Sequence, residues 1–287
     1  IMATKAPVVF ALAMNTNMYE NKIVQNNIDK LKNFGYEFIE PASGRLACGD
    51  IGKGKLEKVD IICEEILSRL YEKKDLVGKK VLITAGPTIS PIDPVRYITN
   101  NSSGKMGYAI AKEARDRGAE VTLISGPSSL EAPIGINFIR VKTNEEMFKA
   151  VLSKFNDSDI VVKSAAVADY KAKNYSTEKI KKGDGGLNLE FIRDNDILKN
   201  LGERKKEQIL VGFAAESNNL LDNAAEKLRK KNLDYIVAND ITARDTGFAS
   251  DFNKVYIIDA EGNTKGLDKM TKREVARELF DLINERR

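Results

Sequence analysis

The 287-residue sequence contains no histidine. Ser-His-Asp catalysis, general-base catalysis by imidazole and most zinc sites are therefore excluded. Chemistry must depend on lysine, aspartate, asparagine and cysteine side chains, on backbone amides and on bound cations. Such groups suit a reaction that needs stabilisation of negative charge more than it needs proton transfer.

The first candidate site follows a β-branched segment at residues 80–86. Gly86 ends this segment, and Ser102, Ser103 and Gly104 stand before a helix expected at residues 105–117. A helix start offers free amides and the positive end of the dipole, and small residues let a phosphate approach the backbone. An ordinary helix with a serine cap is the alternative. Neither GxGxxG nor GxxxxGK[ST] occurs, so the usual phosphate-binding patterns give no support.

Small residues and one acid follow a second apolar segment, at residues 160–166. The stretch from Lys163 to Asp169 leaves room for a flat ring against the backbone. Asp169 could reach a ribose hydroxyl or a hydrated cation. The alternative is an aspartate that starts a turn.

Lysines gather in two further segments. Lys179 and Lys182 lie in the polar stretch 171–186, which contains no large core residue and predicts a mobile lid over a site where negative charge develops. Lys227 and Lys231 are four residues apart and share one helical face, where they could meet a polyphosphate. Solvated surface charge is the common alternative for both groups.

Only one of the two cysteines is placed for chemistry. Cys63 lies in an apolar helix stripe and is expected to fill the core. Cys48 lies in a glycine-rich loop beside Gly49 and Asp50 and is a candidate for proton transfer.

The order of the elements places the sites after residues 86 and 163 at one edge of a parallel sheet. Apolar segments predict strands at residues 80–86, 121–125, 160–166, 209–214, 235–238 and 255–258. Helical periodicity predicts helices at residues 105–117, 144–155, 219–230 and 271–286. This alternation predicts an α/β domain with a Rossmann-like, doubly wound, mainly parallel sheet. Ligands bind beyond the carboxyl ends of the strands in such sheets.

The residues in front predict part of a second, flavodoxin-like α/β domain. Strands are expected at residues 7–12 and 36–39, and helices at about 25–33 and 56–71. A charged stretch before Gly78 suggests domains at residues 1–76 and 77–287. Because the chain opens with Ile1 and enters an apolar segment at once, we expect it to be a fragment cut within that first domain.

Composition limits the class of protein. The chain is 42% hydrophobic and 31% charged, which supports a packed core and excludes disordered, collagen-like and disulfide-scaffold proteins. A net charge of +4 is too balanced to indicate nucleic-acid binding. No apolar run reaches the roughly 20 residues of a membrane span, and we expect no signal peptide. Two cysteines without an extracellular pattern favour a cytoplasmic location.

The candidate segments match a known family in the family's own order. Residues 80–287 resemble the phosphopantothenate–cysteine ligase half of the bifunctional coenzyme A biosynthesis flavoproteins, and residues 6–71 resemble the end of the flavin-dependent decarboxylase half. The ligase motifs are at residues 93–107, 165–170, 179–182, 212–216, 232–234 and 238–240. The decarboxylase motifs are at residues 13–18 and 44–50. Leu12 and Tyr19 depart from the proline and tryptophan that are usual there.

The resemblance implies a two-step ligase. A nucleoside triphosphate, usually CTP in bacterial members, reacts with the carboxylate of 4′-phosphopantothenate to give an acyl nucleotide and pyrophosphate. The amine of cysteine then displaces the nucleotide to form phosphopantothenoylcysteine. Mg²⁺ accompanies the phosphates, and the ligase domain forms a homodimer that joins a larger homo-oligomer in the full-length protein. FMN and the decarboxylation to 4′-phosphopantetheine belong to that full-length protein.

The resemblance also assigns roles to residues of this chain. Asn100 binds the acyl nucleotide, and Lys179 closes over the phosphates. The Ser102–Gly104 helix start holds triphosphate oxygens together with Lys227 and Lys231. The nucleotide contacts implied are Lys163, Ser164, Ala165, Asp169, Lys179, Asn195, Asp196, Ile197, Leu198, Phe213, Lys227 and Lys231. The phosphate loop implied is Gly86, Ser102, Ser103 and Gly104. The implied decarboxylase clamp is Asn15, Ala47, Cys48 and Gly49, with Cys48 as the proton donor.

Several questions stay open at the level of sequence. Backbone contacts near Ala165 could select the base, so the choice between CTP and ATP cannot be read from side chains. The family's decarboxylase histidine is missing, and we therefore expect this chain not to decarboxylate by itself. The alternatives are an NAD-binding Rossmann oxidoreductase and a non-catalytic flavoprotein-derived module. The ligase hypothesis requires Ser103, Asp169, Lys179 and Phe213 to share one cleft.

Overall fold

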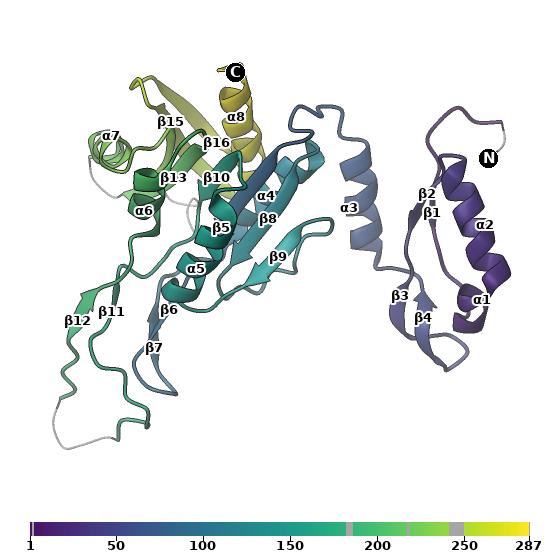
Figure 1. Cartoon of the computed structure of the whole chain (residues 1–287), viewed down its shortest axis with the longest axis horizontal. Helices are drawn as coiled ribbons and strands as arrows, with labels where there is room; N and C mark the ends of the chain where they lie inside the picture. The colour runs from purple at the N-terminus through teal and green to yellow at the C-terminus, as the bar shows by residue number, and fades with distance from the viewer. Residues whose placement is uncertain (2, 182–185, 217–218, 241–249, 287) are drawn as a thin grey trace. The chain divides into compact units, whose positions relative to one another are not determined.

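The computed structural model describes residues 1, 3–181, 186–216, 219–240 and 250–286. Within these ranges no helix combines the length and the apolar character that crossing a membrane requires. The chain divides into two compact units, Ile1–Glu72 and Lys73–Arg287, which are described separately (Figure 1).

The larger unit is built on an eight-stranded sheet. In spatial order its strands are β16 (Thr264–Thr271), β15 (Phe252–Asp259), β14 (Tyr235–Asp240), β13 (Ile209–Glu216), β10 (Ile160–Lys163), β5 (Lys80–Ala85), β8 (Glu120–Ser125) and β9 (Asn137–Arg140). The strands from β14 to β9 are parallel, whereas β15 and β16 form an antiparallel edge. The parallel strands follow the 3-2-1-4-5-6 order of doubly wound folds, with the switch point between β5 and β10. The predicted fold class is confirmed.

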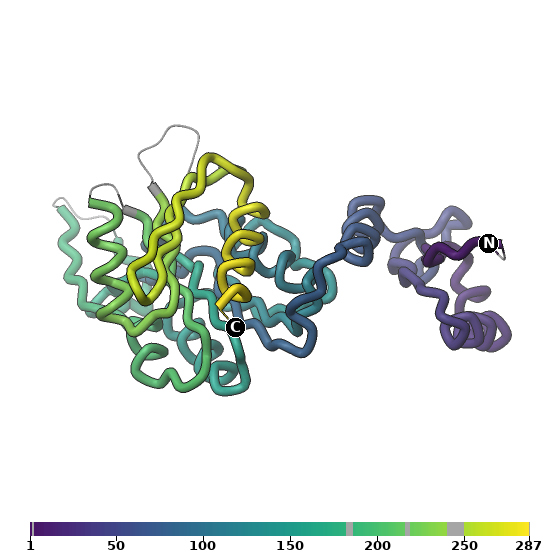
Figure 2. The backbone as a smooth tube through the Cα atoms, turned by 90° about the horizontal axis from the view of Figure 1, so that it is seen from above, coloured from purple at the N-terminus to yellow at the C-terminus, as the bar shows by residue number. Residues whose placement is uncertain are grey.

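Helices cover both faces of this sheet. On one face lie α4 (Lys105–Asp116) and α8 (Lys272–Glu285), which contact each other although they are far apart in sequence; α8 is the yellow helix at the end of the chain in Figure 2. On the other face lie α5 (Asn144–Phe155), α6 (Ile197–Arg204) and α7 (Leu220–Lys230). Alternate side chains of β5 pack into the hydrophobic cores on opposite faces of the sheet. Val81 and Ile83 pack against α4 and α8, and Leu82 packs on the face covered by α5, α6 and α7.

Two small hairpins extend from the sheet toward the bottom of Figure 1. They are β6 (Ile89–Pro91) with β7 (Tyr97–Thr99), and β11 (Tyr170–Ala172) with β12 (Phe191–Arg193). Neither hairpin was expected from the sequence, where both segments look like polar loops. Each strand has only three residues and lies outside the main sheet, so no long alternating apolar pattern marks it.

Several expected boundaries are wrong, and one correction affects the site. The strand predicted at residues 160–166 ends at Lys163. The chain then leaves the sheet toward the loop after β5: the amide of Ala165 donates to the Thr84 hydroxyl, and that of Ala166 donates to the Gly86 carbonyl. The strands β9 and β16 and the helix α6 were also not expected. β16 is a mostly exposed edge strand, which has little apolar alternation to reveal it.

The smaller unit contains two parallel strands, β1 (Val9–Ala11) and β2 (Glu37–Ile39), and a hairpin of β3 (Ala42–Arg45) and β4 (Ile51–Lys55). Its helices are α1 (Thr16–Glu20), α2 (Lys22–Asn33) and α3 (Val59–Arg69). The short helix α1 and the hairpin were not expected. The two strands of the hairpin carry three glycines, which weaken the strand pattern in the sequence.

Candidate functional site

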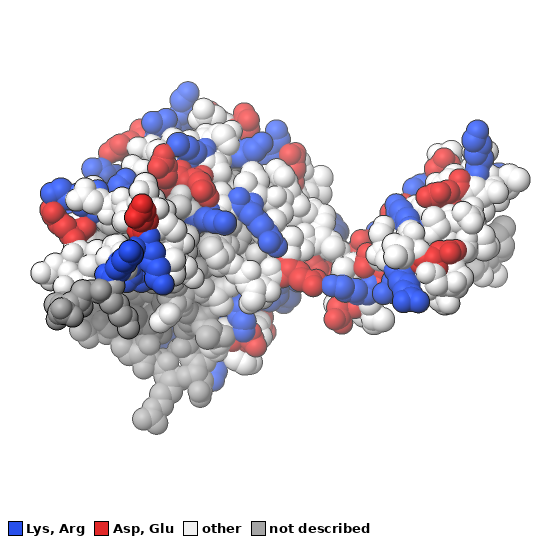
Figure 3. Space-filling model, turned by 90° about the horizontal axis from the view of Figure 1, so that it is seen from below, with Lys and Arg blue, Asp and Glu red and all other residues white. Residues whose placement is uncertain are grey.

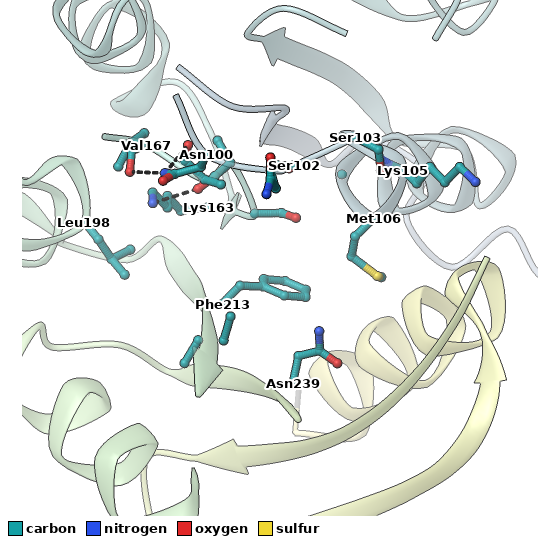
Figure 4. A pocket seen from close by; sticks show the side chains of 18 of the residues that line it. Asn100, Ser102, Ser103, Lys105, Met106, Lys163, Val167, Leu198, Phe213 and Asn239 are labelled. Atoms are coloured by element: carbon teal, nitrogen blue, oxygen red, sulfur yellow. Dashed lines mark hydrogen bonds between the residues drawn. The ribbon is translucent and has the colours of Figure 1, made fainter. Parts of the chain in front are cut away.

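A pocket of about 420 Å³ opens at the carboxyl ends of β10, β13 and β14, beside the topological switch point. Its walls come from residues 100–107, residues 163–167, the end of β13 and the ends of α6 and α7. In Figure 4, Asn100 and Lys163 lie across the cavity from Phe213 and Asn239. The pocket therefore joins segments that are more than 100 residues apart in the sequence.

Glycines bring the start of α4 to this pocket. Gly104 is the N-cap of α4 with φ of 83°, and a Cβ atom there would lie 3.2 Å from the backbone nitrogen of Gly86. A Cβ atom on Gly107 would lie 2.5 Å from the Ala85 Cβ atom. The N-cap residue Gly104 makes no side-chain cap, the Ser103 hydroxyl accepts from the Lys105 amide at 3.4 Å, and the first turn of α4 contains no acid. The positive end of a twelve-residue helix thus lines the pocket, where it favours an anion.

The side chain of Asn100 is held in one orientation. Its Nδ2 atom donates to the carbonyl oxygens of Ala166 at 3.1 Å and Val167 at 2.9 Å. Dashed lines mark hydrogen bonds in Figure 4. The Oδ1 atom therefore points away from these carbonyls. Asn100 links the loop after β5 to the segment after β10, the two sides of the switch point.

Three lysines approach the pocket from the α6–α7 face. Lys163 Nζ donates to the Ala165 carbonyl at 2.8 Å, Lys231 Nζ lies 2.9 Å from an Asp196 carboxylate oxygen, and Lys227 Nζ lies 3.4 Å from the Phe213 carbonyl oxygen. Burial, together with the charges of Lys227 and Lys231, lowers the pKa of Lys163 to about 8. With Asp196 and Asp169 present, this side of the pocket carries both signs of charge.

Most of the residues expected in the nucleotide site line this pocket. They are Asn100, Ser102, Ser103, Gly104, Lys163, Ser164, Ala165, Asp169, Asp196, Leu198, Phe213, Lys227 and Lys231. Ser103, Asp169 and Phe213, three of the four residues required to share a cleft, are among them.

Four expected residues lie outside the lining. Gly86 packs beneath Gly104, Ile197 is buried in the α5–α7 core, and the Asn195 carbonyl accepts a hydrogen bond from Asn144. Lys179 is exposed. Lys182, with residues 183–185 of the expected lid, falls outside the described residues.

The backbone next to Lys179 is tied to the β6–β7 hairpin. The amide of Ile180 donates to the Asp93 carboxylate at 3.2 Å, and the Ile180 carbonyl accepts from Arg96 Nη2 at 2.8 Å. Arg96 in turn pairs with Asp93 at 2.6 Å. Lys179 therefore precedes a residue whose position is fixed by two side chains.

Among the lining residues without a predicted role, five have large or polar side chains from the α4–α8 side and the end of β14. They are Lys105, Met106, Asn239, Asn253 and Lys272. Asn253 and Lys272 come from the antiparallel edge and the last helix, which the sequence does not connect to the site. Lys272 begins an amphipathic helix, where a lysine is usually at the surface, yet it is only 6% exposed. Only the tertiary fold could have revealed it.

A second cluster lies in the smaller unit. Asn15 Nδ2 is 3.3 Å from the Cys48 Sγ atom and 3.4 Å from an Asp50 carboxylate oxygen, which also accepts from Sγ at 3.4 Å. Gly54 permits this contact, because a Cβ atom there would lie 2.2 Å from the Met14 carbonyl oxygen. Asn15 and Cys48, expected in one site, are thus neighbours. Ala47 and Gly49 flank Cys48 in the loop between β3 and β4.

The distribution of charge and of possible metal ligands bears on which ligands the chain could bind. Lysine and arginine side chains are interspersed with acids on the face shown in Figure 3, so no basic surface for nucleic acid stands out on that face. Across the described ranges, no group of three or more Asp, Glu or Cys side chains is placed to hold a metal ion. A cation in the pocket would depend on ligand oxygens as well as on Asp169 or Asp196.

The fold and the pocket define a class. A doubly wound sheet with helix amides and lysines around a cavity at its switch point is typical of α/β proteins that bind small anionic ligands. Residues 76–286 match the family model described as the DNA/pantothenate metabolism flavoprotein C-terminal domain, and residues 1–71 match the model described as Flavoprotein.

Known proteins give the particular family. The chain is 50% identical to the coenzyme A biosynthesis bifunctional protein CoaBC of Bacillus subtilis over 286 residues, 99% of this chain and 70% of that protein. Its identity to the CoaBC protein of Borreliella burgdorferi is 45%, over 99% of this chain and 72% of that protein. A crystal structure of a CoaBC C-terminal domain is 45% identical with a TM-score of 0.63, covering 73% of this chain and 98% of that domain. The chain belongs to the CoaBC family, which confirms the resemblance stated from its motifs.

Proposed function

We propose that residues 77–287 activate the carboxylate of 4′-phosphopantothenate with a nucleoside triphosphate and join it to cysteine. The observation that carries this proposal is the convergence of Asn100, the α4 amides and three lysines on one pocket. These groups stabilise negative charge and transfer few protons, as acyl activation requires. The absence of histidine is consistent with that chemistry.

The proposed roles follow from the positions of the groups. The amides at Ser103 and Gly104 take phosphate oxygens, while Phe213, Leu198 and the backbone near Ala165 surround the nucleoside. Lys163, Lys227 and Lys231 contact the nucleotide from the α6–α7 face. Asn100 Oδ1, directed away from the Ala166 and Val167 carbonyls, orients the acyl nucleotide.

The nucleotide is proposed to bind together with Mg²⁺ and with Lys179. CTP is the proposed nucleotide, and Mg²⁺ is proposed to ride mainly on its phosphates, since Mg²⁺ keeps several waters and needs few protein ligands. Lys179, held next to Ile180, is proposed to reach the phosphates when substrates are bound. Because Lys179 does not line the pocket, this role requires a movement of its side chain or segment.

A pyrophosphate-release assay tests the ligase proposal. The chain is incubated with 4′-phosphopantothenate, Mg²⁺ and CTP, ATP, GTP or UTP in parallel, with and without cysteine. Release without cysteine reports activation, and amide formation on adding cysteine reports the second step. No release with any nucleotide would contradict the proposal. Thermal stabilisation by NADH but not by CTP or ATP would favour an oxidoreductase instead.

We further propose that the ligase unit forms a homodimer through its two hairpins. Tyr97, Ile98, Tyr170 and Ile192 are large apolar residues that are exposed there, from 39% for Ile192 to 56% for Tyr97. Contiguous exposed apolar side chains often mark an interface. Light scattering should give twice the chain mass, and I98E should shift it toward the monomer.

For the smaller unit we propose a partial role. Asn15 and Cys48 are arranged to bind and protonate a decarboxylated product, with Asp50 as an unexpected neighbour. We propose that this chain does not decarboxylate by itself and that FMN and the remaining catalytic groups belong to the full-length protein. Stoichiometric FMN binding with release of carbon dioxide from phosphopantothenoylcysteine by the purified chain would contradict this.

A further inference from the structure

A buried lysine lies at the α4–α8 side of the nucleotide pocket. Lys272 is 6% exposed, and its Nζ atom donates to Asn253 Oδ1 at 2.8 Å and to the Ser250 carbonyl at 2.5 Å. Both Lys272 and Asn253 line the pocket. Burying an ammonium group is costly unless it meets compensating groups, so a buried cation among the residues that line a cavity favours an anionic ligand there.

A second polar side chain beside it has an unmet hydrogen bond. Asn239, at the end of β14, is 8% exposed, and its Oδ1 atom has no partner among the described residues. Figure 4 shows its amide directed into the cavity between Phe213 and Met106. Buried amides are normally satisfied, and either end of this one can be turned toward a ligand.

The two ends of the pocket differ in the acids that line them. On the α6–α7 side, Lys163, Lys227 and Lys231 stand beside two carboxylates, since Asp196 pairs with Lys231 and Asp169 adds a second. On the α4–α8 side, Lys272 lies near Lys105, whose Nζ atom is 2.6 Å from Asp251 at the exposed rim. Among the described residues, both acids that line the pocket are on the α6–α7 side, whereas the α4–α8 side adds the positive end of the helix dipole of α4.

We propose that Lys272 and Asn239 form the subsite for the terminal phosphates of the nucleotide and hold pyrophosphate as it leaves. This assignment rests on the proposed ligase function. A carboxylate oxygen forms the new bond to the α-phosphorus, and the bond from that phosphorus to the bridging oxygen breaks. The electron pair of the broken bond stays on pyrophosphate, whose increased negative charge Lys272 stabilises without any proton transfer.

The pKa of Lys272 fits an anion site. Burial, together with the charge of Lys105, lowers the pKa of Lys272 to about 8. A bound polyphosphate reverses part of that effect, because a nearby negative charge favours the ammonium form. Binding and charge on Lys272 are therefore mutually reinforcing.

The test compares inorganic pyrophosphate with CMP as ligands of the whole chain, by calorimetry and as inhibitors of the ligase reaction. Loss of one charged hydrogen-bond partner should weaken pyrophosphate binding by K272Q about tenfold to a hundredfold. CMP binding should change less than about threefold. K272R should recover part of the pyrophosphate affinity. The matched control is K254Q, since Lys254 is exposed on the neighbouring strand β15 and should bind both ligands as the native chain does.

A second variant locates the opposite end of the nucleotide. K231Q should weaken CMP binding more than pyrophosphate binding, the reverse of K272Q. Equal affinity of K272Q and the native chain for pyrophosphate would overturn the subsite, as would an equal loss of CMP and pyrophosphate affinity. If the native chain releases pyrophosphate from CTP, the ligase proposal stands even when the subsite fails; if it does not, the proposed function itself fails.

Discussion

The Asp93 carboxylate accepts a hydrogen bond from the backbone amide of Ile180, 87 residues further along the chain, at 3.2 Å. The Asp93 side chain is fully buried and also accepts from the Val95 and Arg96 amides and from the Arg96 guanidinium. The bond from Arg96, followed by the backbone amides, holds the pKa of Asp93 far below its usual range. Asp93 therefore remains ionised at neutral pH and fixes the residue that follows Lys179.

The first prediction concerns this positioning role. D93N replaces an oxygen that accepts from Ile180 and Arg96 with a donor, so the Lys179 segment should lose its anchor. Turnover should fall about tenfold, with little change in KM for CTP, because positioning matters most at the transition state. K179Q should lower turnover by a similar factor, also with little change in KM for CTP. The double variant should be no worse than the poorer single variant, because the two residues act as one unit.

Pyrophosphate release at saturating CTP gives the rates for this double-mutant cycle. The matched control is D157N, an exposed aspartate whose loss should leave turnover unchanged. Additive losses in the double variant would show that Asp93 acts independently of Lys179, and full turnover by D93N would remove its positioning role.

The second prediction concerns Asn100. N100D replaces the amide that donates to the Ala166 and Val167 carbonyls with a carboxylate, which these two oxygens repel. The side chain should turn away and cease to orient the acyl nucleotide. We expect either no turnover or accumulation of the acyl nucleotide, measured by quenching the reaction and separating nucleotide products. N156D is the control at an exposed position. Native rates without accumulated intermediate would exclude the assigned role.

Most of the residues expected from the sequence line one pocket because they belong to segments at the ends of strands. Ser103 lies between β5 and α4, Lys163 ends β10, and carboxyl ends of parallel strands meet at one edge of a sheet. Lys272, in contrast, could not be assigned to the pocket from the sequence. It enters the pocket only because two antiparallel strands, β15 and β16, return the chain to that edge before α8 begins. No local pattern around Lys272 carries that information.

The same contrast holds for the fold. The periodic segment predicted as a helix at residues 144–155 is α5 with the same bounds, and in the structure Thr143 and Glu146 form a capping box at its start. The hairpin of β6 and β7 is missed because each strand has three residues. Its conformation depends on Asp93 and Arg96 binding a distant segment, which is a tertiary contact and not a local preference.

The third prediction tests how α4 is seated. G107A places a methyl group 2.5 Å from the Ala85 Cβ atom, so α4 must move away from the end of β5. Overpacking of this kind should cost about 1–3 kcal/mol of unfolding free energy. It should also weaken CTP binding, because the start of α4 lines the pocket. Urea unfolding and CTP titration measure the two effects.

The matched control for G107A is G186A. A Cβ atom on Gly186 would meet nothing within 4 Å among the described residues, so this variant should keep native stability. A G107A variant as stable as the native chain, with unchanged CTP binding, would show that α4 can shift without disturbing the pocket.

The last prediction concerns the pH dependence of stability. The pKa of Lys272 is about 8 in the folded chain, below the roughly 10.4 of an unfolded lysine, so between these values the unfolded state binds more protons. The contribution of Lys272 to the free energy of unfolding should therefore rise with pH over this window and stay flat below pH 8. Over the whole window the rise should approach about 3 kcal/mol.

Urea unfolding of the native chain and of K272M, without nucleotide, from pH 7 to 10.5 gives this contribution as a difference, in which all other titrating groups cancel. Lys105 and Asp251, the charged neighbours of Lys272, are retained in both proteins. K254M should show no such pH dependence, because Lys254 is exposed. A difference between the native chain and K272M that stays constant across the window would mean that Lys272 keeps an ordinary pKa, and the buried cation at the phosphate end of the pocket would then need another explanation.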